Sequence, residues 1–195
     1  MRIFKRFGHN TAGAVTVETS LLIGGLILLS GGAIEASYAF YQYNGAQIAA
    51  RTGARIAATY DPVSRDMRNL NTLNAANYAR TCSSETRRCS QGGYDGSAMQ
   101  AIVYGPDLDG ACGATNQGRR GMCDVFNDVQ LAHVDVSYSS AGLTTSGRPD
   151  PAPIVTVTLR DVPLNFAFLD MVGFKNIATL PSVEVTVMGE DLKNG

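Results

Sequence analysis

The chain has 195 residues, of which 45% are hydrophobic and 17% charged, and its formal net charge is −1. This length suits one domain of ordinary size with an appendage rather than two large domains. The balanced charge argues against a nucleic-acid-binding protein, which needs a surplus of basic side chains. The two histidines leave little material for a metal centre or a histidine-based catalyst, and we expect no cofactor.

The hydrophobic residues are concentrated near the amino terminus. Arg2, Lys5 and Arg6 form a basic start, and the later run Thr19–Ile34 has no charged side chain. A bilayer core of ~30 Å requires about 20 helical residues, which the stretch from about Val15 to Phe40 supplies. We predict a membrane-spanning helix. A cleaved secretory signal and the core helix of a soluble protein are the alternatives.

The flanking residues orient this helix. Basic side chains precede the span, so the amino terminus should stay in the cytoplasm while the rest of the chain crosses the membrane. Tyr38, Phe40 and Tyr41 follow the apolar run, and aromatic side chains are typical of the outer membrane interface. We expect Glu35 to lie among the outer headgroups.

Glu18 is the only charged residue between Phe7 and Ile34. A carboxylate in the first turn of a helix is favoured by the helix dipole, but in lipid it is costly unless shallow, neutral or paired. Its surroundings, Gly13-Ala14-Val15-Thr16-Val17-Glu18 behind a basic leader, resemble a class III prepilin leader.

The wider segment resembles the TadE family, the pseudopilins of the tight-adherence (Flp, type IVc) pilus system. The resemblance covers roughly residues 8–60 and rests on Glu18, the apolar run, Ile34-Glu35, Phe40 and the Ala- and Arg-rich stretch that follows.

The resemblance implies that a prepilin peptidase cuts between Gly13 and Ala14 and removes residues 1–13 as a basic leader. Glu18 would then lie in a buried position near the new amino terminus. The amine of a neighbouring subunit would neutralise this carboxylate and set the register between packed helices, because a partnerless buried charge is costly.

Small side chains repeat within the predicted membrane helix, on a ladder of four-residue steps interrupted by Leu28: Ser20, Gly24, Gly32 and Ala36. Small residues at this spacing permit close contact between helices in lipid, where hydrophobicity gives no net attraction. We predict that these four residues, the assembly ladder, pack with Glu18 against other pilin-like helices.

The same helix is predicted to continue beyond the membrane, so that it spans residues 14–60. Its outer part carries one stripe of small residues: Ala46, Ala49, Ala50, Gly53, Ala54, Ala57 and Ala58. Arg51 and Arg55 share the opposite side. We interpret the stripe as packing against the protein's own sheet. A seam for another pilin-like helix is the alternative.

Residues 61–195 are predicted to form the exported α+β domain. Asp61-Pro62 ends the long helix, and a shorter helix from about Ser64 to Arg80 is expected, with Ser64 as its cap. The apolar run Met99–Tyr104 is expected to be a strand.

Alternation of apolar and polar side chains predicts strands around three later segments: 134–138, 155–160 and 183–188. This period of two is typical of an antiparallel sheet with one buried face. The link Ser139–Pro153 reads as a loop. The apolar segment Val162–Phe174 should cover the core or a partner surface. The predicted fold is pilin-like: a long helix packed on a sheet of three or four antiparallel strands.

The four cysteines allow three disulfide pairings. We predict the sequential one, Cys82–Cys89 and Cys112–Cys123, because it closes short loops. Disulfides persist outside the cytoplasm, where the topology places this domain. The competing zinc site is disfavoured because the chain has no Cys-x-x-Cys, so we expect no metal.

No catalytic motif is present in the sequence, and we predict a non-enzymatic, structural role. The chain is expected to be a single-pass protein of a bacterial cytoplasmic (inner) membrane, with its domain periplasmic or extracellular. It would act as a TadE-like minor pilin or pseudopilin in assembly or export of a Flp-type pilus. Its expected partners are the bilayer, prepilin peptidase, pilin-like helices and assembly proteins. Nucleic acids and small-molecule substrates are not expected.

Two other functions remain open at this point. The first is an anchored binding module of an envelope complex unrelated to a pilus, with the Gly-rich disulfide loops at 82–123 as its recognition surface. The second is a secreted protein that begins near residue 34 after its signal is removed.

Overall fold

The computed structural model describes residues 11–68, 78–106, 112–113, 119–144, 151–171, 173 and 178–189. The chain divides into two compact units. The first comprises Met1–Phe40 and Asn165–Lys175, and the second comprises Tyr41–Leu164 and Asn176–Gly195. One helix, α1 (Thr11–Thr59), contributes to both. Most of the expected leader lies outside the described residues.

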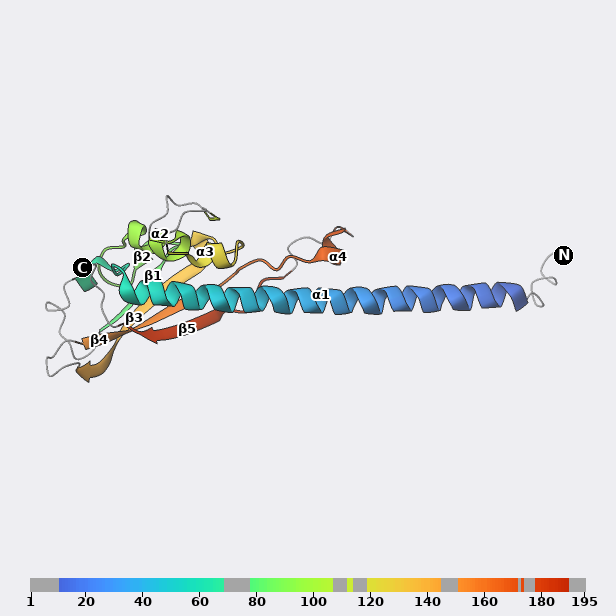
Figure 1. Ribbon diagram of the computed structural model, residues 1–195, viewed down its shortest axis with the longest axis horizontal. Helices are drawn as coiled ribbons and strands as arrows, with labels where there is room; N and C mark the ends of the chain where they lie inside the picture. The colour runs from blue at the N-terminus through green and yellow to red at the C-terminus, as the bar shows by residue number, and fades with distance from the viewer. Residues whose placement is uncertain are drawn as a thin grey trace. The chain divides into compact units, whose positions relative to one another are not determined.

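The second unit contains a five-stranded antiparallel sheet in the order β2-β1-β3-β4-β5 (Figure 1). Its strands are β1 (Ala79–Ser83), β2 (Arg88–Cys89), β3 (Val134–Thr144), β4 (Pro151–Leu159) and β5 (Val183–Met188). The predicted α+β class with a long amino-terminal helix is confirmed, with five strands instead of three or four. The strands absent from the prediction are β1 and β2, which form a short hairpin at one edge.

The predicted alternation is confirmed in the three long strands. Val136 of β3 lies opposite Val157 of β4, which lies opposite Val185 of β5. Val136 and Val157 are buried, as period-two patterning requires of the inner face. The link Ser139–Pro153 is shorter than expected, because β3 continues to Thr144 and β4 begins at Pro151. Small hydroxyl-bearing residues are compatible with the exposed face of a sheet, so composition alone misled the loop prediction.

The prediction of a strand at Met99–Tyr104 is wrong. These residues belong to helix α2 (Gly96–Tyr104), whose cap is Asp95. The Asp95 carboxylate accepts hydrogen bonds from the backbone N–H groups of Ser97 and Ala98, which satisfies two donors at the helix start. A short apolar run does not distinguish a buried strand from a buried helix, and the cap decides between them.

The expected helix from Ser64 to Arg80 is also wrong at both ends. The chain makes one 3-10 turn, η2 (Arg65–Arg68), and β1 already begins at Ala79. Ser64 is not a helix cap, because its hydroxyl donates to the backbone oxygen of Gln91 and to Asp66. Residues 69–77 lie outside the described residues.

Three short elements complete the described fold: α3 (Met122–Val125), η4 (Leu131–His133) and α4 (Ala167–Met171). His133 ends η4 and precedes β3, so it is not a strand residue as expected. Its ring Nδ1 accepts a hydrogen bond from the backbone N–H of Gln130.

The stripe of small residues on α1 packs inside the protein's own domain, as the first interpretation predicts. All seven residues of the stripe are buried, while Arg51 and Arg55 are exposed. The alanines belong to one core cluster with the inner faces of the strands. At Gly53 a Cβ atom would lie only 2.3 Å from Sδ of buried Met122, so an added methyl group would force this buried side chain to move.

We expect Gly53→Ala to destabilise the domain even though alanine favours a helix by ~1 kcal/mol over glycine. The added methyl group overpacks the contact with Met122, a change that costs ~1–3 kcal/mol in tightly packed cores. Thermal unfolding of the full-length protein in detergent measures the change. Gly24→Ala is the matched control, because nothing lies within 4 Å of its Cβ position. A Gly53→Ala protein at least as stable as wild type would contradict the packing argument.

Candidate functional site

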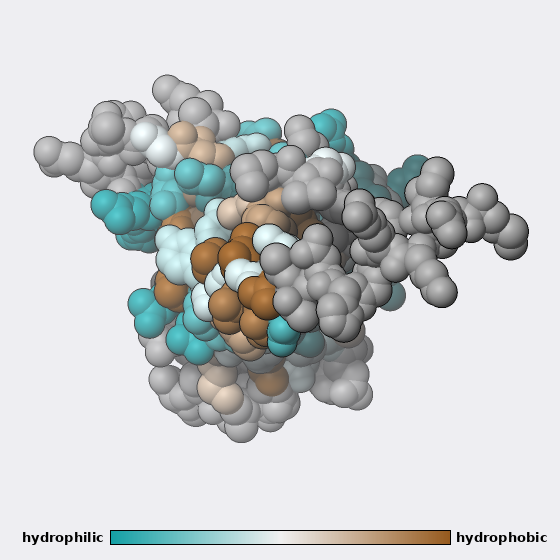
Figure 2. Space-filling view, turned by 90° about the vertical axis from the view of Figure 1, so that its right-hand side faces the viewer, coloured by the Kyte–Doolittle hydropathy of each residue, from teal (hydrophilic) through white to brown (hydrophobic). Residues whose placement is uncertain are grey.

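The amino-terminal part of α1 exposes its large apolar side chains. Leu21 is 71% and Leu29 75% exposed, and hydrophobic side chains, brown in Figure 2, gather at the centre of the face shown there. A core helix of a soluble protein buries such side chains, so their exposure argues against that alternative. Among the described residues, α1 is the one helix long and apolar enough to cross a membrane.

Hydroxyl groups within this apolar stretch have their hydrogen bonds satisfied by the helix itself. Each donates to a backbone oxygen three or four residues earlier: Thr16, Thr19, Ser20, Ser30 and Ser37. Inside a bilayer no water is available, and every polar group needs an internal partner. These side chains therefore suit a helix surrounded by lipid.

The expected processing and pairing residues lie on the first turns of α1. Gly13, Ala14 and Glu18 are all exposed. No described residue donates a hydrogen bond to the Glu18 carboxylate or forms an ion pair with it. This exposed carboxylate is accessible to a cationic group from outside the chain. The family resemblance implies that this group is the amine of a neighbouring subunit.

The assembly ladder is also exposed along its whole length. Nothing lies within 4 Å of the positions that a Cβ atom would occupy at Gly24 and Gly32. The hydroxyl group of Ser20 donates its hydrogen bond to the backbone oxygen of Val17, so this donor is already satisfied within the helix. Within the described residues, this face is accessible to another helix at close range.

A second carboxylate of α1, Glu35, is in the opposite situation. It is only 7% exposed, and α4 lies beside the helix that carries it (Figure 1). Glu35 Oε2 accepts a hydrogen bond from the backbone N–H of Ala167 at 3.2 Å, and Oε1 accepts one from Leu169 at 2.9 Å. Oε1 also accepts the N–H of Phe168.

These contacts satisfy both partners. The first N–H groups of any helix lack carbonyl acceptors within the helix, and a carboxylate bound to them is favoured by the helix dipole. The ring of Phe168 packs on Gly31, with ring carbons 3.7 Å from the position of a glycine Cβ. The sequence analysis did not predict this contact. It noted Glu35 and the apolar segment Val162–Phe174 separately, but nothing in the sequence connects them.

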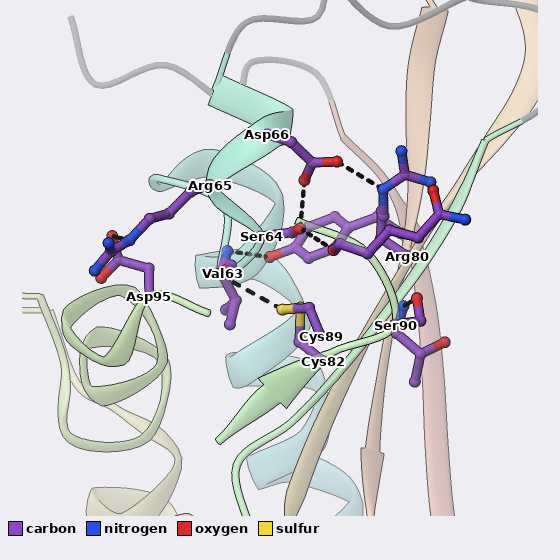
Figure 3. The surroundings of a disulfide bond; sticks show 12 residues. Val63, Ser64, Arg65, Asp66, Arg80, Cys82, Cys89, Ser90 and Asp95 are labelled. Atoms are coloured by element: carbon purple, nitrogen blue, oxygen red, sulfur yellow. Dashed lines mark hydrogen bonds and ion pairs between the residues drawn. A yellow bond between two sulfur atoms is a disulfide. The ribbon is translucent and has the colours of Figure 1, made fainter. Parts of the chain in front are cut away.

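The first disulfide, Cys82–Cys89, joins residues directly opposite each other on β1 and β2 (Figure 3). Beside it, Arg80 of β1 contacts Asp66 through Nε and Oδ2 at 2.8 Å. Ser64 donates to the other oxygen of the same carboxylate. This bridge and ion pair tie the edge hairpin to the chain that leaves α1.

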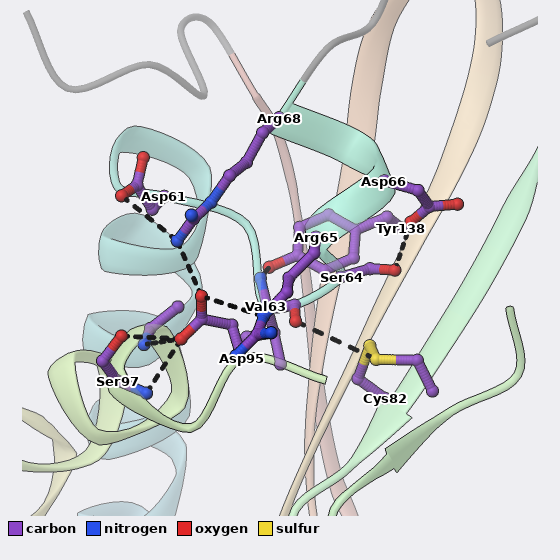
Figure 4. A network of polar contacts seen from close by, with 12 residues as sticks. Asp61, Val63, Ser64, Arg65, Asp66, Arg68, Cys82, Asp95, Ser97 and Tyr138 are labelled. Carbon is purple, nitrogen blue, oxygen red and sulfur yellow. Dashed lines mark hydrogen bonds and ion pairs between the residues drawn. A yellow bond between two sulfur atoms is a disulfide. The ribbon is translucent and has the colours of Figure 1, made fainter. Parts of the chain in front are cut away.

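Asp95 is the centre of a second polar network (Figure 4). Besides capping α2, its Oδ2 lies 2.6 Å from Nη2 of Arg68, which also contacts Asp61 at 3.7 Å. Close by, the backbone N–H of Val63 donates to the hydroxyl of fully buried Tyr138. These bonds fix the turn between α1, α2 and β3.

The second disulfide, Cys112–Cys123, is present with the predicted sequential pairing. Asp124 supports it, because its carboxylate accepts the backbone N–H groups of Gly113 at 2.7 Å and Gly121 at 2.9 Å. Residues 107–111 and 114–118 of the proposed recognition loop lie outside the described residues. The contacts of both bridges give them a structural role.

Acid should weaken the domain through Asp95. Burial raises the pKa of the Asp95 carboxyl group. Hydrogen bonds from Ser97 and Ala98 and the charge of Arg68 lower this pKa by a larger amount, so it lies below the ordinary value. A lowered folded-state pKa stabilises the fold at neutral pH, and this contribution is lost as the pH falls through the folded-state pKa.

We therefore expect Asp95→Asn to lower the free energy of unfolding at neutral pH by about 0.5–1 kcal/mol, because asparagine still caps a helix but loses the charge that faces Arg68. The difference from wild type should shrink below about pH 4, where an ordinary aspartate is half protonated. Urea unfolding of the full-length protein at a series of pH values measures this. Glu184→Gln, an exposed change on β5, serves as control. An equal deficit at every pH would rule out the electrostatic explanation.

Comparison with known proteins identifies the amino-terminal segment. The family model described as TadE-like protein matches residues 13–55, which lie within α1. No curated protein and no solved structure is significantly similar to the chain. The match covers Glu18, the assembly ladder and part of the buried alanine stripe. The resemblance predicted from the sequence is confirmed for this segment: residues 13–55 of the long helix match the TadE-like family model.

Proposed function

We propose that the protein is a membrane-anchored minor pilin or pseudopilin that serves the assembly or export of a Flp-type, tight-adherence pilus. Its role is structural rather than enzymatic. The observation that carries the proposal is the TadE-like match on a helix whose large apolar side chains are exposed. That combination is expected of a helix that meets lipid and other helices rather than its own core.

The proposed topology follows the charges around the helix. The basic residues before the span keep the amino terminus in the cytoplasm, and the disulfide-containing domain lies on the periplasmic or extracellular side. The two disulfides support this location, since such bonds persist in oxidising compartments.

In the proposed mechanism, the helix docks beside pilin-like helices through the assembly ladder. The exposed Glu18 carboxylate accepts the amine of a neighbouring subunit, which fixes the register of the two helices. Close approach is possible at Gly24 and Gly32, where no described atom occupies the space beside the backbone. The exported domain then caps or primes the growing fibre.

The decisive test is complementation of a gene deletion in an organism that makes such pili. Deletion should abolish or strongly reduce surface piliation, and wild type should restore it. Glu18→Ala should fail to restore piliation while inserting into the membrane normally, because only the inter-subunit pair is lost. Thr19→Ala, an exposed change on the same turn, is the matched control. Unchanged piliation after deletion would refute the function, and equal losses of insertion and piliation would refute the pairing role.

Processing of the leader has its own test. We expect mass spectrometry of the native protein to find a chain that begins at Ala14, and Gly13→Val to block this cleavage, since the peptidase is expected to require glycine before the cut. A chain that begins at residue 1 indicates an uncleaved signal anchor. A chain that begins near residue 34 and dissolves without detergent indicates a secreted protein. Either result contradicts a prepilin-type substrate.

A further inference from the structure

The segment Asn165–Met171 lies between two parts of the chain that contact each other. The backbone N–H of Leu164 donates to the oxygen of Ala178 at 3.0 Å, and Pro163 and Thr179 form an antiparallel bridge. Between these points the chain carries Phe166, Phe168 and Leu169, each only half-buried. We call Asn165–Met171 the strap.

The strap is held on α1. The three N–H groups at the start of α4 converge on the Glu35 carboxylate, and the ring of Phe168 lies on Gly31. These contacts use one turn of the helix. The neighbouring ladder residues Gly32 and Ala36 remain exposed, so the strap and a partner helix do not compete for the same face.

The length of the apolar helix fixes the depth of this turn. At ~1.5 Å per residue, the stretch Val15–Ile34 covers ~30 Å, the thickness of a bilayer's hydrocarbon core. Glu35 follows directly, and exposed Tyr38, Phe40 and Tyr41 come next. Aromatic side chains of this kind gather at the membrane interface. A strap bound at Gly31 and Glu35 therefore lies at the outer boundary of the hydrocarbon.

Glu35 is compatible with this depth because its charge is compensated locally. A carboxylate at the edge of a bilayer needs donors that water cannot fully supply. Three backbone N–H groups provide them, and bonds between N–H groups and an ionised oxygen are among the stronger hydrogen bonds. The strap in turn gains acceptors for N–H groups that would otherwise be unsatisfied in lipid.

We propose that the strap is a second membrane contact: Phe166 and Phe168 enter the outer headgroup and acyl-chain boundary beside α1, and Glu35 holds them there. The occupant of this apolar surface is lipid, because the partly exposed rings continue the exposed apolar surface of α1 at its outer end. This inference rests on the proposed membrane anchoring of α1. It adds an interfacial attachment on a segment that lies outside the matched residues 13–55.

The chain contains no tryptophan, so a single introduced indole reports its own surroundings. Full-length Phe168→Trp is reconstituted in vesicles of phosphatidylethanolamine and phosphatidylglycerol. The lipids carry bromine either near the headgroup or near the chain ends. We expect strong quenching of the F168W indole by the shallow bromines and little by the deep ones.

Two further variants calibrate the depth. Leu22→Trp, in the middle of the apolar run, should be quenched best by the deep bromines, and Glu184→Trp on β5 by neither set. If L22W is quenched and F168W is not, the strap proposal fails while the membrane anchor stands. If L22W is not quenched either, the anchoring itself fails. Preferential quenching of F168W by the deep bromines also overturns the interfacial location.

The holding role of Glu35 is tested in the F168W background. Glu35→Ala should remove most of the shallow quenching, because the strap loses the acceptor for its N–H groups. Glu35→Gln keeps one acceptor oxygen and should give an intermediate value. Glu18→Ala, the same change at the exposed carboxylate of the same helix, should leave the quenching as it is. Equal quenching in the Glu35 and Glu18 variants would overturn the holding role.

Discussion

The single helix α1 exposes its side chains in one part and buries them in the core of the domain in the other. The rest of the fold depends on the change from large to small side chains along this helix. In its amino-terminal part α1 carries exposed Leu, Ile and Val side chains. In its carboxy-terminal part the buried positions are almost all alanine or glycine. Small residues there let Met122 and the inner faces of the strands reach the helix backbone. Large ones would push the helix out of its own domain.

The two acidic residues of the apolar part illustrate how one helix uses the same chemical group differently. Glu35 is buried and has backbone donors from α4, so its charge is compensated within the chain. Glu18 is exposed and has no such donors among the described residues. A carboxylate compensated internally serves the fold, whereas one left accessible is suited to a partner. The contrast supports the assembly role proposed for Glu18 and the structural role of Glu35.

The sequence predicted those features whose pattern is local. Val134, Val136 and Tyr138 alternate because strand side chains alternate, and the confirmed sequential disulfides join cysteines that are close in the sequence. The run at Met99–Tyr104 was too short for its period to be read, and its helix depends on the cap at Asp95.

The bond between Glu35 and the strap was beyond sequence reasoning for a different reason. Its partners are separated by 132 or more residues, and no local period connects them. A buried acid in an apolar helix indicates that hydrogen-bond donors lie near it. Here the donors are backbone N–H groups, which every residue except proline has, so the sequence does not show which of them bind Glu35. The TadE-like match, which ends at residue 55, carries no information about the strap either.

The order of the cysteines has a consequence for how the domain matures. Each bridge joins neighbours along the chain, with separations of 7 and 11 residues. With the amino terminus held in the cytoplasm as proposed, the domain that follows α1 would cross the membrane in chain order, so Cys82 and Cys89 would emerge together before Cys112 and Cys123. Emergence in this order favours the sequential pairing over the two alternatives, each of which joins a cysteine of the first pair to one of the second.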